Sequence, residues 1–361
     1  MARLWSTRAY KEGDEHAIFE LRKAAYPSVE VDQQTWLERW HWMYRENPAG
    51  NAKVWLAEVG DRIVGQSAVI PVRMKCGREV VTGFQSIDTL THPDYRGQGI
   101  YTTLAQQAYA EAASEGMHVG YRFPNRNSHP IAVKKLDWFD VAQRRIMFKP
   151  CNWGNIVALK IRNRPLSWVT AIGAGLAFSL ATLTRSRRPP VGAGVTVGEV
   201  DSFDDRINTF WDRVCKCHQV MVVRDKSYLN WRYADVPGVK YTILLAEGGA
   251  EIEGYLVMRC RQWSNLKVGA IYDVLALKQE VADCLIYEAL LRFDCEKPDF
   301  VFGSIVAEAP VVSTFRKRGF ADVSLLRKAP FCAYTYNERV PREFLADRRN
   351  WYSQLGDSDS I

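Results

Sequence analysis

The stretch Thr91-His92-Pro93-Asp94-Tyr95-Arg96-Gly97-Gln98-Gly99-Ile100-Tyr101 decides the fold of this chain. It connects a predicted strand over residues 80–90 with a predicted helix over residues 99–115, which Gly116 ends. The first N–H groups of a helix have no partner within the helix, and the helix dipole makes that end positive. Because glycine also lets the backbone approach a ligand closely, we predict that this turn binds a pyrophosphate, with a charge-assisted contact from Arg96.

The chain around this turn reads as an α/β domain. Apolar residues recur at helical spacing in three segments, at residues 14–26, 36–43 and 127–136, and Asp32 is a candidate cap for the second of them. Runs of β-formers between turn residues predict strands at residues 4–8, 54–59, 63–72, 80–90 and 118–123 and a closing extended segment at 138–148. We therefore expect a mixed central sheet flanked by helices.

A second run of elements, over residues 195–336, repeats this order. Strands are expected at residues 195–200, 241–247, 254–260, 270–277, 300–306 and 331–336, and helices at 204–217, 226–233, 280–295 and 310–318. We interpret the repeat as an internal duplication of one fold. Lys278-Gln279-Glu280 stands where the first copy has its glycines, so the second copy is expected to lack the anion-binding turn.

The predicted organisation has four parts. A first domain covers residues 1–150, a basic apolar connector covers 151–192, the second copy covers 193–336, and a tail covers 337–361. For the tail two alternatives stay open, namely a disordered end and a segment that folds into the cleft and supplies Asp357 or Asp359.

The connector is unusual in charge. No Asp or Glu occurs from Val141 to Gly198, and its centre, residues 166–183, is uncharged and largely apolar. Three interpretations stay open: packing against the protein's own domains, a membrane span, and contact of residues 160–188 with the surface of an anionic membrane. The scattered cysteines indicate a reduced, cytoplasmic setting, and contact with the inner membrane surface is the alternative.

Composition excludes several other classes of protein. Of the 361 residues, 47% are apolar and 25% are charged, and the formal net charge is +7, which suits a globular protein with anionic ligands. No helix carries a dense basic stripe, so no nucleic-acid partner is expected. The 8 cysteines are scattered, and Cys215 and His218 lack a second ligand pair, so no metal is expected.

The residues Arg96-Gly97-Gln98-Gly99-Ile100-Tyr101 resemble the Arg/Gln-x-x-Gly-x-Gly/Ala signature of the Gcn5-related N-acetyltransferases (GNAT), with Tyr101 at the final small position. The resemblance implies tandem GNAT-like folds of α/β (α+β) class, the second copy degenerate, and an acyl-CoA cosubstrate such as acetyl-CoA. It implies that the following residues hold this cosubstrate: Ile87, Thr89, Leu90, Arg96, Gly97, Gln98, Gly99, Ile100, Tyr101 and Asn125.

The same resemblance leaves the catalytic groups open. Many relatives carry a tyrosine acid where this chain has Val133, and the second copy has Phe315 there. The candidates for proton transfer are Asp88, Tyr121 and His129. Asp88 is a base if it points into the cleft and otherwise a strand-end residue. For His129 the favoured alternative to a base is a helix-start residue.

A further resemblance concerns the acceptor. Residues 228–233 and 351–359 look like elements of two-domain acetyltransferases found with bacterial polysaccharide biosynthesis. This implies transfer of an acyl group to an amine or hydroxyl on a sugar, or on a polysaccharide or lipid-linked precursor. A CoA-binding protein with weak chemistry and a small-molecule or antibiotic N-acetyltransferase are the alternatives.

Overall fold

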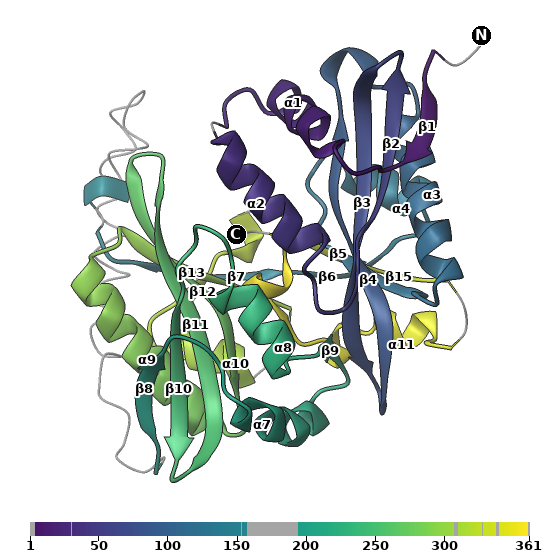
Figure 1. Cartoon of the computed structure of the whole chain (residues 1–361). Helices are drawn as coiled ribbons and strands as arrows, with labels where there is room; N and C mark the ends of the chain where they lie inside the picture. The colour runs from purple at the N-terminus through teal and green to yellow at the C-terminus, as the bar shows by residue number, and fades with distance from the viewer. Residues whose placement is uncertain are drawn as a thin grey trace.

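The computed structural model describes residues 4–29, 31–152, 154–156, 194–306, 310–326, 328–336 and 339–359. Two mixed sheets with helices against their faces make up this part of the chain (Figure 1). The expected α/β class with two helix-flanked sheets is confirmed. The predictions for residues 160–188 and for the apolar centre at 166–183 fall outside the described residues.

The first sheet has the strand order β1-β2-β3-β4-β5-β15-β6, and β9 pairs with β3. Of these pairs only β4 and β5 run parallel. The strands are β1 (Ser6–Ala9), β2 (Lys53–Val59), β3 (Arg62–Cys76), β4 (Glu79–Thr91), β5 (Val119–Arg122), β6 (Phe139–Gln143), β9 (Val220–Val222) and β15 (Pro330–Thr335).

Helices cover both faces of this sheet. Both α1 (Glu15–Ala25) and α3 (Ile100–Ser114) contact β3, whose residues 63–72 are buried without interruption. Because successive side chains of a strand point to opposite faces, this unbroken burial places α1 and α3 on different sides. The other helices are α2 (Gln33–Tyr44), which the predicted cap Asp32 begins by accepting the Thr35 N–H at 2.9 Å, and α4 (His129–Lys135).

The second sheet repeats this plan, with the order β14-β7-β13-β12-β11-β10-β8 and β16 paired to β13. Here too one pair, β12 and β13, is parallel. Its strands are β7 (Arg145–Pro150), β8 (Thr196–Val200), β10 (Thr242–Gly248), β11 (Glu251–Trp263), β12 (Leu266–Ala276), β13 (Phe300–Val306), β14 (Ala321–Asp322) and β16 (Ser353–Gln354). Its helices are α7 (Arg206–Val214), α8 (Lys226–Leu229), the π-helical turn η3 (Asn230–Ala234), α9 (Gln279–Glu296) and α10 (Pro310–Lys317).

The two sheets exchange strands. The extended segment expected at residues 138–148 forms two strands, of which β6 lies in the first sheet and β7 in the second. In return β15, expected in the second copy, pairs with β5 and β6 of the first sheet. The boundary predicted at residue 150 therefore follows the order of the chain but does not separate the sheets, which share backbone hydrogen bonds.

The C-terminal tail is folded between the two sheets (Figure 1). It contains α11 (Arg342–Ala346), the turn η5 (Arg348–Asn350), β16 and the turn η6 (Leu355–Asp357), and residues 351–358 are all buried. The Arg224 side chain, 0% exposed, donates to both oxygens of Asp357 at 3.0 and 2.9 Å and to Asp273 at 2.9 Å. Of the two alternatives for the tail, the structure has the folded one.

The membrane alternatives for residues 160–188 concern a segment outside the described part of the chain. Within the described ranges, each helix is too short or too polar to cross a bilayer.

The Arg224 contacts predict a large loss of stability on removal of the guanidinium. Arg224→Met leaves Asp273 and Asp357 as unpaired buried charges, so we expect the free energy of unfolding to fall by about 3–5 kcal/mol. Arg213→Met is the matched control, because Arg213 pairs with Glu251 and Glu253 at the surface and should lose less than about 1 kcal/mol. Urea denaturation measures both, and equal small losses would contradict the prediction.

Candidate functional site

The turn that opens α3 has the backbone that its glycines suggest. Gly97 and Gly99 have φ of 79° and 82°, in the left-handed region that favours glycine. A Cβ at Gly97 would meet no described atom within 4 Å, so the requirement is conformational and not one of space. Residues 96–99 are exposed, whereas Ile100 is 1% exposed and anchors the helix in the core. The start of α3 therefore follows an exposed loop, and its first N–H groups have no partner within the helix, as an anion site requires.

The strand before this turn has an unpaired edge. β4 pairs with β5 at Phe84 and Gln85, and no described strand continues this ladder along residues 86–91. Ile87 and Leu90 are buried and pair with β3 on the other edge. The Oγ1 of Thr89 is buried and has no hydrogen-bond partner in the described part of the chain. This edge can accept an extended ligand as an added strand.

Asp88 lies at a bulge in β4. The register with β3 shifts between Gln66 and Ala68, and Asp88 has a φ of 43°, which is uncommon for a residue with a side chain. Such backbone strain clusters at functional sites. The bulge brings the carboxylate to α2, where the Tyr44 hydroxyl donates to Asp88 Oδ2 at 2.6 Å.

Asp359 of the tail joins Asp88 in an acidic pair. Burial, then the negative charge of Asp88, raises the pKa of Asp359 to about 6. Burial also raises the pKa of Asp88, although the Tyr44 hydrogen bond opposes that shift. Both residues are nevertheless exposed, so solvent reaches the two carboxyl groups and weakens these shifts. Groups with shifted pKa values gather at functional sites, which makes this pair a candidate for proton transfer.

Hydrogen bonds from the second half place Asp359. The guanidinium of Arg232 donates to the carbonyls of Gly356 and Ser358, each at 2.9 Å, and so fixes the backbone on both sides of Asp357. The sequence left Asp359 as one alternative and did not single out Tyr44 or Arg224. The stretch 228–233, noted for its aromatic residues, contains Arg232 and was the available signal.

The other predicted catalytic residues have partners elsewhere. Tyr121 is buried on β5, its hydroxyl donates to the Asp357 carbonyl at 3.1 Å, and burial raises its pKa well above the usual range. His129 begins α4, with its Nε2 2.6 Å from Asp140 Oδ1. Within the described residues, no hydrogen bond connects His129 or Tyr121 to Asp88. Their catalytic roles stay predictions.

The remaining predicted ligand residues differ in exposure. Gln98 and Arg96 are exposed, and Arg96 Nε donates to the Thr91 carbonyl at 3.4 Å. The Tyr101 hydroxyl accepts from Arg122 at 2.7 Å. Asn125 Oδ1 accepts the N–H groups of Asn127 and Ser128, both at 2.9 Å, and so caps the turn before α4.

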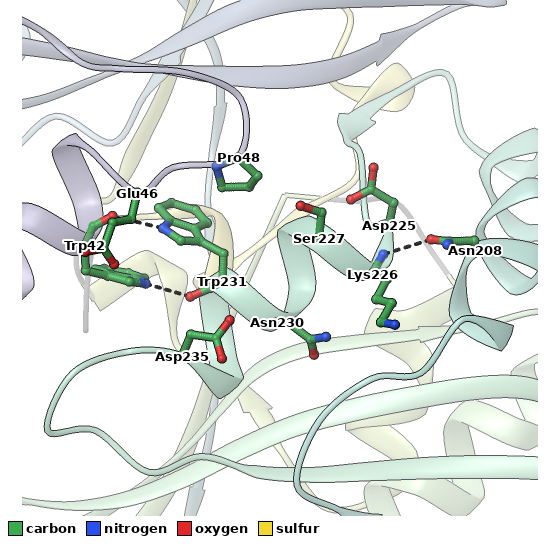
Figure 2. A pocket seen from close by; sticks show the side chains of 10 residues that line it. All are labelled: Trp42, Glu46, Pro48, Asn208, Asp225, Lys226, Ser227, Asn230, Trp231 and Asp235. Carbon is green, nitrogen blue, oxygen red and sulfur yellow. Dashed lines mark hydrogen bonds between the residues drawn. The ribbon is translucent and has the colours of Figure 1, made fainter.

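A groove of about 570 Å³ lies where the first half meets the second (Figure 2). Trp42 of α2 and Trp231 of η3 stack at 4.8 Å, and each indole N–H donates to the other's backbone carbonyl, at 2.8 and 3.0 Å. Polar side chains line the rest of the groove, among them Glu46, Asp225, Lys226, Ser227 and Asp235. The sequence did not predict this groove, because its two walls are far apart along the chain.

Comparison with known proteins agrees with this geometry. Residues 6–138 match the family model described as Acetyltransferase (GNAT) domain. The fold is similar to a GCN5-related N-acetyltransferase from Anabaena variabilis (TM-score 0.62, 10% identity, covering 92% of this chain and 73% of that chain). It is also similar to Saccharomyces cerevisiae N-myristoyltransferase with bound myristoyl-CoA (TM-score 0.63, 10% identity, 93% and 84%) and to a probable N-acyltransferase from Enterococcus faecalis (TM-score 0.61, 11% identity, 92% and 72%).

These likenesses are structural. A search of curated proteins gave no sequence match. The chain therefore has a fold like that of tandem GNAT-like structures, and its residues 6–138 match the GNAT domain model that the glycine signature implied.

The acidic pair predicts a pH-dependent gain of stability in Asp359→Asn. A folded-state pKa of about 6, above the ordinary value of 3.8, means that the folded protein prefers the protonated acid. The wild type therefore loses stability as pH rises from about 4 to about 6, and the amide avoids this loss. We expect a gain of about 1 kcal/mol at pH 7.5, less than the full shift would give because solvent reaches the carboxyl, and none at pH 3.5.

Urea denaturation at the two pH values measures this gain. Asp347→Asn is the control of opposite sign, because a side-chain hydrogen bond from Arg349 lowers the pKa of Asp347 to about 2. Its substitution should lower stability at pH 7.5. An Asp359→Asn gain that is equal at both pH values would exclude ionisation as the cause.

Proposed function

We propose that this protein transfers an acyl group from acyl-coenzyme A, acetyl-CoA in the first instance, to an amine or hydroxyl of an acceptor. The observation that carries the proposal is the exposed glycine turn at the start of α3, beside the unpaired edge of β4 and inside the segment that matches the GNAT domain model.

The residues present fit a CoA thioester. The N–H groups of residues 97–100 would hold the pyrophosphate with Arg96, and the backbone of residues 87–90 would hold the pantetheine arm. The orphaned Oγ1 of Thr89 would gain a partner there. When bound, the cosubstrate supplies an activated thioester carbonyl, so the protein has to orient the acceptor and accept its proton.

Asp88 is the base that we propose. Burial raises the pKa of the Asp88 carboxyl toward neutral pH, and a base is most effective when its pKa lies near the pH at which it works. Tyr44 orients the carboxylate by donating to Oδ2, and Asp359, whose pKa the charge of Asp88 raises, is the second carboxyl of the pair. Two interacting carboxylates also favour an acceptor that arrives as an ammonium ion.

For the acceptor we propose a sugar, or a polysaccharide or lipid-linked precursor, that carries an amine. The groove of Figure 2 offers carboxylates, amides and a hydroxyl, which suit a hydroxyl-rich molecule. The groove and the contacts of the acidic pair draw residues from the same two elements. Helix α2 carries both Trp42 and Tyr44, and η3 carries both Trp231 and Arg232. Cytoplasmic location, with membrane contact through residues 160–188, stays a prediction.

A thiol-release assay tests the activity. Purified protein is mixed with acetyl-CoA and with amino sugars, nucleotide-linked amino sugars, aminoglycosides or buffer alone, and CoA binding is measured separately by thermal shift. We expect binding of CoA and release of thiol with the sugar acceptors. Binding without turnover would favour the CoA-binding alternative, turnover with aminoglycosides alone would favour the antibiotic-modifying one, and absence of binding would refute the proposal.

Asp88→Asn should lower kcat by about 10²–10⁴-fold, since the amide cannot accept the proton, with little change in KM for acetyl-CoA. Asp94→Asn makes the same change of charge at an exposed position of the loop and should keep wild-type kcat. In the wild type, activity should fall as pH drops through the range where the acidic pair takes up a proton. Asp359→Asn removes the carboxyl whose pKa the charge of Asp88 raises, and should move this acidic limb to lower pH. A limb that stays in place in Asp359→Asn would contradict the pairing.

A further inference from the structure

Arg122 is a buried cation for which the structure shows no anion. Its side chain extends from β5 toward α3, the residue is 4% exposed, and Nη1 donates to the Tyr101 hydroxyl at 2.7 Å. Its Nε is buried and has no acceptor in the described part of the chain. No carboxylate of that part forms an ion pair with the guanidinium, which instead lies 5.3 Å from the Trp138 ring and 5.9 Å from the Tyr101 ring.

Two other buried arginines of this fold have carboxylate partners. Arg224 pairs with Asp273 and Asp357, and Arg318 pairs with Asp283. A buried charge without a counter-charge is unfavourable, and aromatic rings offset only part of that penalty. A structural role in this apolar site would be served as well by an apolar side chain. The guanidinium therefore points to a ligand of negative charge.

The position of Arg122 near the start of α3 indicates the kind of anion. Tyr101, its hydrogen-bond partner, is the second residue of α3 and follows Gly99 and Ile100 of the exposed turn. Through this hydrogen bond the guanidinium of Arg122 contacts a side chain from the first turn of α3, the end that the helix dipole makes positive. In the interior of low dielectric constant, its field is screened less than that of the exposed Arg96.

We propose that Arg122 is a positioning residue for the phosphate groups of the cosubstrate. Its buried charge raises the affinity of the turn at residues 96–100 for an anion, and its hydrogen bond to Tyr101 fixes the first turn of α3. This inference rests on the proposed function and extends it, because it assigns recognition of the phosphates to a residue outside the glycine signature.

The test compares a ligand with phosphates and one without. Dissociation constants are measured for CoA and for pantetheine, which lacks the phosphates and the nucleotide. Arg122→Met should weaken CoA binding by about tenfold or more and leave pantetheine binding within about twofold. Lys134→Met, which removes an exposed positive charge from α4, is the matched control and should leave both constants unchanged.

The stability of the variants separates a binding role from a structural one. Arg122→Met should unfold at the wild-type temperature or above it, because an apolar chain of similar length replaces an unpaired buried charge. Arg122→Lys keeps the charge and should keep CoA affinity within about threefold.

Several outcomes would overturn the inference. Equal losses for CoA and pantetheine, unchanged CoA binding in Arg122→Met, or failure of Arg122→Met to fold would each show that the charge does not serve the phosphates. If the wild type still binds CoA in those cases, the proposed function stands. A wild type that binds no CoA would refute the proposed function, and the inference with it.

Discussion

The guanidinium of Arg224 connects the parts of this protein on which the site depends. It donates to Asp273 on β12, to Asp357 in the tail and to the carbonyl of Val222 on β9, which pairs with β3 of the first sheet. Asp273 Oδ2 also accepts from the Tyr255 hydroxyl at 2.9 Å. One buried cation thereby connects both sheets to the tail. Breaking either of its ion pairs would leave a buried charge without a partner.

The two copies of the fold differ at the start of the helix that connects their parallel strands. In the first copy the helix that connects the two parallel strands begins after a left-handed glycine, Gly99. In the second copy α9 begins after Lys278, which is extended, and the Gln279 side chain is engaged with Ser313 at 2.7 Å. The second copy therefore offers no comparable anion site. Its buried residues hold the tail, and the tail carries Asp359 to the first copy.

What the sequence could predict was set by distance along the chain. The glycine turn, its strand and its helix lie within a few consecutive residues, so local rules for glycine and helix starts sufficed to locate them. Periodicity identifies a strand but not its neighbour, so the extended segment at 138–148 did not reveal that Arg144 separates strands of two sheets. The contacts of Asp88 with Tyr44 and Asp359 join remote segments, and no local pattern encodes them.

Charged side chains from remote segments of the chain act on the acidic pair. Burial and the charge of Asp88 raise the pKa of Asp359, and a backbone hydrogen bond, then Arg232 and Arg144, lower it again. Arg232 also fixes the backbone that presents Asp359, so the same side chain sets both the place and the ionisation of the acid. Strand exchange brings Arg144, between β6 and β7, to the junction of the sheets. The duplicated fold therefore places charges from both halves around one carboxyl pair, and neither half alone contains all of them.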